Sequence, residues 1–125
     1  MLSKVISAIG RMPIEFKLRG DVSMARLMRE SGYLAEQSLV TVELLIAHFA
    51  QHPDDLDAWH RKSLDNRGSS SWYLLGPSES NFPGKWEVGF HPGENREYFD
   101  HGEDACALFV KNWLIQVSAN AHGAS

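Results

Sequence analysis

The sequence predicts an α+β fold with N-terminal helices, a short antiparallel β-meander and a C-terminal helix packed on the sheet. Two periodicities lead to this prediction. Apolar residues recur at helical spacing in 42–49, whereas in 85–91 they alternate with polar residues or glycine as in a half-buried strand. The stretch 53–75 begins as a helix and ends in a bulky, β-prone run. It therefore joins a helical first half to a β-rich second half.

Composition predicts a single domain over residues 1–125 that needs neither a metal nor a disulfide. The chain has 125 residues, of which 43% are hydrophobic, enough to bury one core. The lone Cys106 excludes an internal disulfide and lies in an apolar run typical of a small buried side chain. No apolar run approaches the roughly 20 residues of a membrane span, and the N-terminus lacks the profile of a secretory signal. We therefore expect a cytoplasmic protein with no cofactor and no membrane contact.

The charge balance argues against direct binding of nucleic acid. The 16 Asp and Glu residues outnumber the 12 Lys and Arg residues, giving a net charge of -4, whereas nucleic-acid-binding domains normally carry a clustered basic face. Most of the acidic residues follow residue 50. They are either ordinary solvated surface or a face that attracts a basic protein by electrostatic steering, and composition leaves both interpretations open.

The first part of the chain is predicted to hold a strand and a helix. Apolar residues in 1–9 are compatible with a short helix, but those in 13–19 alternate with charged residues as in a half-buried strand. The proline that opens this strand suits an edge position, because proline cannot donate to a ladder. Asp21 is the expected N-cap of a helix over 22–31, and Gly32 is expected to end that helix in a left-handed conformation.

Two further helices are predicted before the junction. Thr41 or Ser38 is the expected N-cap of the first, which ends before Pro53. The second covers 54–64, where aspartates in the first turn suit the positive end of the helix dipole. Its Trp59 is an expected apolar anchor of the core, as is Trp72 in the strand that follows.

A histidine pair near the end of the first of these helices has a spacing found in metal sites. His48 and His52 are four residues apart, a spacing that can hold a metal on one helix face. A site needs a third ligand, and no H-E-x-x-H motif or cysteine pair accompanies them. Histidines in a last turn also suit the terminal carbonyls, so no metal site is predicted.

The second half is predicted to be a meander closed by a helix. Strands are expected over 72–75, 85–91 and 97–99, with a proline- and glycine-rich loop over 76–84. Asp100 and Glu103 form a capping-box-like start for a last helix over 102–117, and 118–125 is expected to be a frayed tail. The apolar stripe of this helix is expected to comprise Cys106, Phe109, Val110, Trp113 and Val117.

A set of short motifs covers residues 21–118. One helix ends in His-Pro, the next carries Trp and Ser, a turn with Asp-x-Arg and Ser-Ser-x-Trp-Tyr leads into a strand, and the last helix opens Ala-Cys-Ala. The positions are His52, Pro53, Trp59, Ser63, Asp65, Arg67, Ser70, Trp72, Tyr73, Ala105, Cys106 and Ala107. This pattern resembles a group of small bacterial immunity proteins encoded beside contact-dependent growth inhibition or related polymorphic toxins.

The resemblance implies that the protein functions by binding another protein. An immunity protein of this kind is an antitoxin: it binds one cognate toxin domain, often a basic nuclease, and neutralises it by covering the active site. Such inhibition requires tight protein binding and no turnover, so we do not expect an enzyme. Physically, Asp65 and Arg67 are interpreted as residues that pin the turn, with a binding loop as the alternative.

The toxin is expected to contact a small set of acidic and aromatic side chains. These are Asp57, Glu79, Phe82, Glu94 and Glu97. The alternative functions are a regulatory or adaptor domain that binds another protein, and a small hydrolase. A hydrolase would have to use Cys106 with a histidine, His60 with Ser63 or Asp57, or His91 with His101. None of these sets is accompanied by a recognised catalytic motif, so no catalytic residue is predicted.

Overall fold

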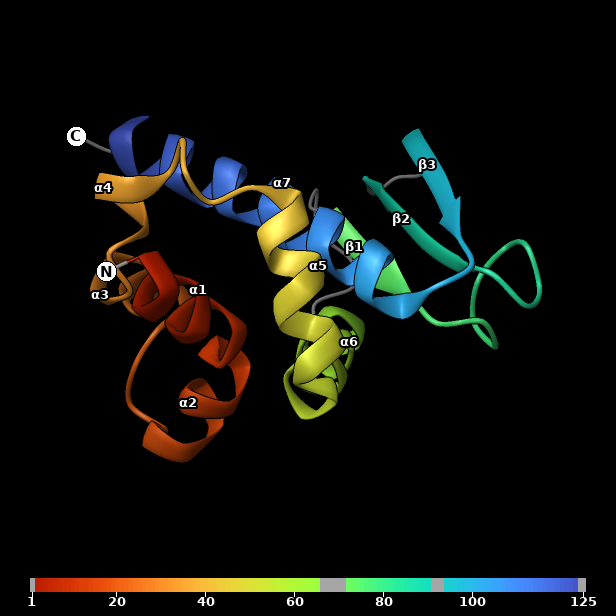
Figure 1. The fold of residues 1–125 in the computed structure, drawn as a ribbon, viewed down its shortest axis with the longest axis horizontal. Coiled ribbons are helices and arrows are strands. Elements are labelled where there is room, and N and C mark those ends of the chain that lie inside the picture. Colours follow the sequence, from red (N-terminus) through yellow and green to blue (C-terminus); the bar gives the residue numbers. More distant parts are fainter. Residues whose placement is uncertain (1, 66–71, 91–93, 124–125) are drawn as a thin grey trace.

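The computed structural model describes residues 2–65, 72–90 and 94–123 and confirms the α+β class. Helices make up the first half, three strands follow, and a long helix ends the described chain (Figure 1). The helices are α1 (Leu2–Gly10), α2 (Met12–Arg19), α3 (Met24–Glu30), α4 (Tyr33–Glu36), α5 (Val42–Gln51), α6 (Pro53–Asp65) and α7 (Gly102–Gly123). The strands are β1 (Trp72–Leu75), β2 (Trp86–Phe90) and β3 (Glu94–Phe99).

The strands form an antiparallel meander in the order β1-β2-β3. Leu74 of β1 lies opposite Val88 of β2, and both side chains are buried in the core that the helices cover. Side chains alternate across a strand, so the neighbouring positions point to the other side of the sheet. We call that side the outer face; it carries Tyr73, Glu87 and Tyr98.

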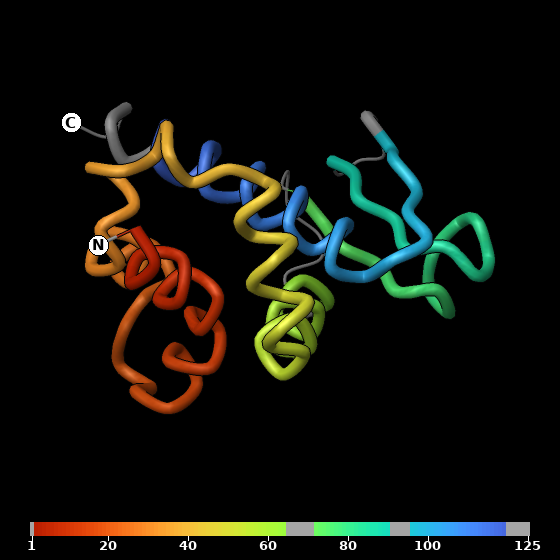
Figure 2. Tube along the Cα trace, in the orientation of Figure 1, coloured from red at the N-terminus to blue at the C-terminus, as the bar shows by residue number. Residues whose placement is uncertain are grey.

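Helix α7 connects the two halves of the molecule. It contacts all three strands, α5, α6 and α3, and its path can be followed from the sheet to the N-terminal helices (Figure 2). The first three residues of its expected stripe are buried, but Trp113 and Val117 are only partly buried, and Leu114 is fully buried instead. The stripe broadens because α7 passes between several partners, whereas a surface helix packs against one.

Helix α7 extends beyond its expected end at residue 117. Helix α7 continues to Gly123, and Ser118 is buried, with its hydroxyl donating to the carbonyl of Ile115 at 3.1 Å. The small, polar composition that suggested a tail is tolerated because the serine hydroxyl bonds within the helix itself.

The prediction of a strand over 13–19 is also wrong, because this segment lies in α2. Its proline occupies the first turn, where a missing N–H needs no partner, and Gly20 ends the helix with φ 73°. The alternating pattern arises because α2 is apolar on two sides. Phe16 packs against the core, whereas Ile14 and Leu18, four residues apart, lie on another side of the helix.

The start of the following helix also differs from the expectation. Ser23, not Asp21, is the N-cap: its Oγ accepts the backbone N–H of Arg26 at 3.0 Å, and α3 therefore begins at Met24. The left-handed conformation of Gly32 is confirmed, with φ 89°, and it separates α3 from the short α4.

Helices α5 and α6 follow the prediction closely. Thr41 is the N-cap of α5, since its Oγ1 accepts the N–H of Leu44 at 3.3 Å, and α5 ends before Pro53. Trp59 of α6 is buried, and its indole Nε1 donates to the carbonyl of Ile9 at 3.2 Å. This hydrogen bond joins α6 to the C-terminal turn of α1.

One edge of the sheet is closed by a side chain of α6. Ser63 Oγ donates to the carbonyl oxygen of Leu74 at 3.1 Å and accepts the Leu74 N–H at 2.7 Å. These main-chain groups of β1 point away from β2, as at a non-hydrogen-bonded position of an antiparallel pair. Strand β3 forms the other edge.

Candidate functional site

The loop between β1 and β2 lies against the outer face and carries two of the residues expected to bind a partner. Phe82 is 53% exposed, and its ring centroid lies 5.6 Å from that of Tyr98, which is 38% exposed. Two adjacent exposed aromatic rings suit an interaction site, because aromatic side chains are enriched among the residues that dominate interface energetics. The exposed Arg96 lies two residues before Tyr98 on β3. We call the surface formed by Phe82, Tyr98 and Arg96 the aromatic surface.

Sequence reasoning missed Tyr98 and Arg96 because their importance depends on strand register. Tyr98 lies opposite Glu87 in the β2–β3 pair, which places it on the outer face beside the loop. Arg96 is two residues earlier on the same strand and therefore on the same side. The signal available in the sequence was the alternation in β3, which begins at Glu94 and not at the expected 97.

A buried carboxylate holds the loop in place. Glu87 is fully buried on the outer face, although the sequence places it among polar strand positions. Its oxygens accept the Tyr73 hydroxyl at 2.5 Å, the Asn81 backbone N–H at 2.8 Å and the Asn81 side-chain amide at 3.1 Å. Arg96 Nε lies 3.9 Å away. Asn81 immediately precedes Phe82. The network therefore fixes the backbone of the loop next to the residue that carries the exposed ring.

The network also shifts the ionisation of its tyrosine. Burial, together with the hydrogen bond to the Glu87 carboxylate, raises the pKa of Tyr73 to about 12. The Tyr73 hydroxyl therefore stays protonated across the physiological pH range and remains a hydrogen-bond donor to Glu87.

The carboxylate of Glu79 is held by contacts with three neighbouring residues. Its Oε1 accepts the Gly76 N–H at 2.9 Å and lies 2.8 Å from His60 Nε2, and Ser78 Oγ also donates to the carboxylate. These hydrogen bonds lower the pKa of Glu79 to about 2. Glu79 is an exposed residue, but these contacts hold its carboxylate in place and tie the start of the loop to α6.

The other acidic residues expected to bind are scattered. Asp57 is exposed on α6, and Glu97 is exposed on β3 opposite Val88, so it points to the opposite side of the sheet from Tyr98. The side chain of Glu94 lies outside the described residues. The structure therefore does not gather the expected acidic residues around Phe82.

In two of the three residue sets that a hydrolase would use, the structure gives the side chains other environments or contacts. Burial raises the pKa of the Cys106 thiol well above its ordinary value, which lowers its nucleophilicity. Ser63 bonds β1, and His60 bonds Glu79 and stacks edge-on against Trp86. His91 lies outside the described part of the chain. The expected turn residues at 67 and 70 and the side chain of residue 65 also lie outside it.

Of the two histidines at the end of α5, His48 is buried and His52 is the exposed C-cap. His48 Nε2 lies 2.7 Å from Asp55 Oδ2, and the His52 ring stacks on the His48 ring with a centroid distance of 4.3 Å. Within residues 2–65, 72–90 and 94–123, no group of three or more His, Cys, Asp or Glu side chains is placed to hold a metal ion.

Comparison with known proteins does not assign a family. No protein-family model matches the chain, and no curated protein or solved structure matches it. In the part of the chain that the structure describes, no helix is both long and apolar enough to cross a membrane. The function must therefore be argued from the surfaces described above.

Proposed function

We propose that this chain works by binding another protein, with the aromatic surface as the centre of the interface. The observation that carries the proposal is the exposed Phe82–Tyr98 pair held over a fully bonded, buried Glu87. A side chain that is already fixed loses little entropy on binding, so a preorganised aromatic pair favours tight association. Arg96 adds a side chain of the type enriched at interface hot spots.

We further propose that the partner is a toxin domain that the chain neutralises by covering its active site. The sequence motifs that resemble immunity proteins support this identity. The net charge of -4 and the exposed Asp57 and Glu97 suit electrostatic steering toward a basic nuclease. In this scheme the two acidic side chains act at a distance through the overall field and affect the association rate, whereas the aromatic surface determines how long the complex lasts.

Co-expression with the toxin domain encoded beside this gene tests the proposal. The expected result is survival of cells that carry both chains and death of cells that carry the toxin domain alone. A double variant, Phe82→Asp with Tyr98→Asp, is expected to lose protection while it remains folded by circular dichroism. Leu39→Asp is the matched control, because Leu39 is also 53% exposed but lies before α5. If the double variant protects cells as well as the wild type does, the aromatic surface is not part of the interface.

The adaptor alternative uses the same surface with a different partner. It is favoured if the neighbouring gene encodes no toxin domain, or if the purified chain fails to bind the domain that it encodes. In both cases the immunity assignment is overturned, while the effect of the Phe82 and Tyr98 substitutions on any partner found there still tests the surface itself.

A further inference from the structure

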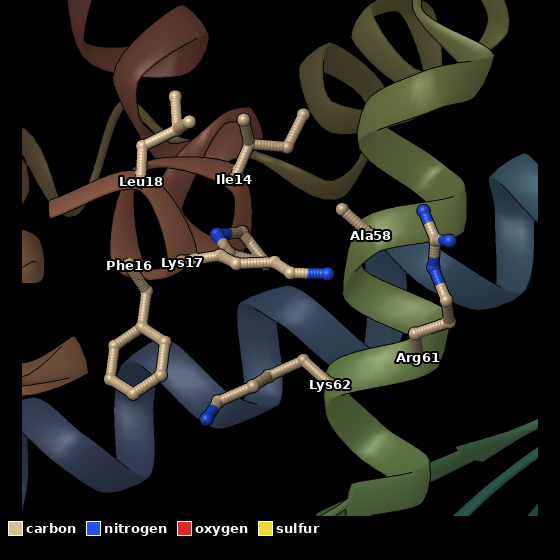
Figure 3. A pocket seen from close by; sticks show the side chains of 8 residues that line it. Ile14, Phe16, Lys17, Leu18, Ala58, Arg61 and Lys62 are labelled. Carbon is tan, nitrogen blue, oxygen red and sulfur yellow. The ribbon is translucent and has the colours of Figure 1, made fainter. Parts of the chain in front are cut away.

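A groove between α2 and α6 lies on helices remote in sequence from the aromatic surface. Its volume is about 410 Å³, and eight residues line it: Pro13, Ile14, Phe16, Lys17, Leu18, Ala58, Arg61 and Lys62 (Figure 3). This volume is within the range of about 300–1,000 Å³ in which proteins hold small ligands or anchoring side chains.

The α2 wall of the groove carries apolar side chains that do not belong to the hydrophobic core. Ile14 and Leu18 form an i, i+4 pair outside the hydrophobic core, and Leu18 is 71% exposed. This is the second apolar side of α2 that gives the segment its strand-like alternation. An i, i+4 apolar pair is also the spacing that meets the apolar face of another helix.

The groove is also basic, in a protein of net negative charge. Lys17 extends from α2 toward α6, and Lys62 extends from α6 back toward α2 (Figure 3). Lys62 Nζ lies 3.9 Å from the centroid of the Phe16 ring, a cation–π contact that holds the ammonium group over the groove. Arg61 lies beside Lys62 on α6, so cationic groups come from both walls.

These three cations differ from their neighbours in having no acidic partner among the described residues. Arg11, Arg19 and Arg26 each pair with a glutamate on α2 or α3. By contrast, no carboxylate in the described ranges forms an ion pair with Lys17, Arg61 or Lys62. The groove therefore presents apolar walls and unneutralised positive charge together, and a ligand that complements it must carry both apolar groups and several anionic groups.

We propose that this groove binds an acidic, amphipathic peptide segment of a partner protein, with its apolar side chains against Ile14 and Leu18 and its carboxylates on Lys17, Arg61 and Lys62. Cations on both walls match carboxylates that flank an apolar stripe, the pattern of an acidic amphipathic helix. A single-headed anionic amphiphile would leave part of this charge without a partner. Nucleic acid would use the cations but leave the apolar wall of α2 exposed to water.

Calorimetry with a synthetic peptide tests the proposal directly. The probe is a short helical peptide with leucines four residues apart, flanked by glutamates, titrated into the full chain. Two altered peptides accompany it, one with glutamine for glutamate and one with serine for leucine. The expected result is binding of the parent peptide and weaker binding of both altered peptides. Amide resonance shifts should concentrate in 13–18 and 58–62.

Charge reversal in the groove provides the second arm. Lys17→Glu with Lys62→Glu is expected to weaken binding of the parent peptide about tenfold or more, since two favourable ion pairs become repulsive. Lys4→Glu with Arg29→Glu is the matched control: both residues are exposed, neither lines the groove, and the net charge changes equally. Thermal melts establish that both variants are folded.

Three outcomes overturn the proposal. The first is absence of binding by the parent peptide, and the second is equal loss of affinity in the groove variant and the control variant. The third is tighter binding of a single-stranded oligonucleotide or of laurate than of the peptide. Because the measurement uses no toxin, its result is independent of the co-expression experiment on the aromatic surface.

Discussion

His48 Nε2 lies 2.7 Å from Asp55 Oδ2, and the two side chains are only 7% and 6% exposed. The pair crosses the junction at which α5 ends and α6 begins, so it fixes the angle between these helices. Gly10 of α1 lies against the same imidazole, where a Cβ atom would be 2.1 Å from Nε2. Three helices therefore meet around one buried polar contact.

Removing the carboxylate should destabilise this junction. Asp55→Ala leaves the buried imidazole of His48 without its partner, and we expect a loss of about 1–3 kcal/mol in the free energy of unfolding. Urea denaturation at neutral pH measures it. Asp54→Ala is the matched control, since Asp54 lies in the same helix turn but is exposed. Equal losses in the two variants would assign the effect of Asp55 to the helix dipole.

Adding a methyl group at Gly10 should also destabilise the protein. Alanine normally stabilises a helix relative to glycine by about 0.5–1 kcal/mol, but here its Cβ would overlap the His48 ring. We expect Gly10→Ala to cost about 1–3 kcal/mol by overpacking. In a His48→Ala background the same substitution should become neutral or stabilising. A cost that persists without the imidazole would show that another contact is responsible.

The Tyr73–Glu87 bond should contribute to stability more than an exposed tyrosine hydroxyl does. Tyr73→Phe removes a donor from a buried carboxylate, with an expected cost of about 1.5–3 kcal/mol, as for hydrogen bonds to charged groups. Tyr98→Phe on the same face deletes a hydroxyl from a more exposed ring and should cost far less. Thermal and urea unfolding compare them. Similar costs would mean that the hydrogen bond from Tyr73 to Glu87 contributes no more to stability than the exposed Tyr98 hydroxyl does.

Glu79 should make the protein acid-sensitive. Its hydrogen bonds hold its pKa at about 2, against an ordinary value of 4.5. The folded protein therefore binds this proton less readily than the unfolded chain does, and the stability contributed at neutral pH is lost as the pH falls from about 4.5 toward 2. The difference in unfolding free energy between wild type and Glu79→Gln should be largest at neutral pH and shrink across this window.

A charge control separates this effect from general acid denaturation. Glu97→Gln removes an exposed carboxylate that forms no ion pair with the described residues. At neutral pH it should differ from wild type less than Glu79→Gln does. A difference for Glu79→Gln that stays constant with pH would contradict the role of its hydrogen bonds.

The parts of the fold that depend on neighbours in sequence could be predicted. The N-cap at Thr41, the end of α5 before Pro53 and the strand at β1 follow from local residue preferences. Segment 13–19 could not be assigned correctly, because two apolar sides on a short helix produce the same alternation as a strand. Its packing against α1, α3 and α6, which the sequence does not show, distinguishes the two structures.

The candidate site was predictable in part for the same reason. Phe82 could be identified from its place in a proline- and glycine-rich loop. Tyr98 and Glu87 could not, because their roles depend on the register of β2 and β3. The basic groove was hidden for a further reason: the net charge of the chain is negative, and residues more than forty positions apart supply its cations.

The bonds between Ser63 and Leu74 have a consequence for how this protein can associate. Since α6 occupies the hydrogen-bonding groups of β1 at that position, an incoming β-strand can extend the sheet only beyond β3. Arg96 and Glu97 stand along that border, and charged side chains there discourage indiscriminate sheet extension. A strand from another chain would therefore pair with β3, and it would need charges that complement those of Arg96 and Glu97.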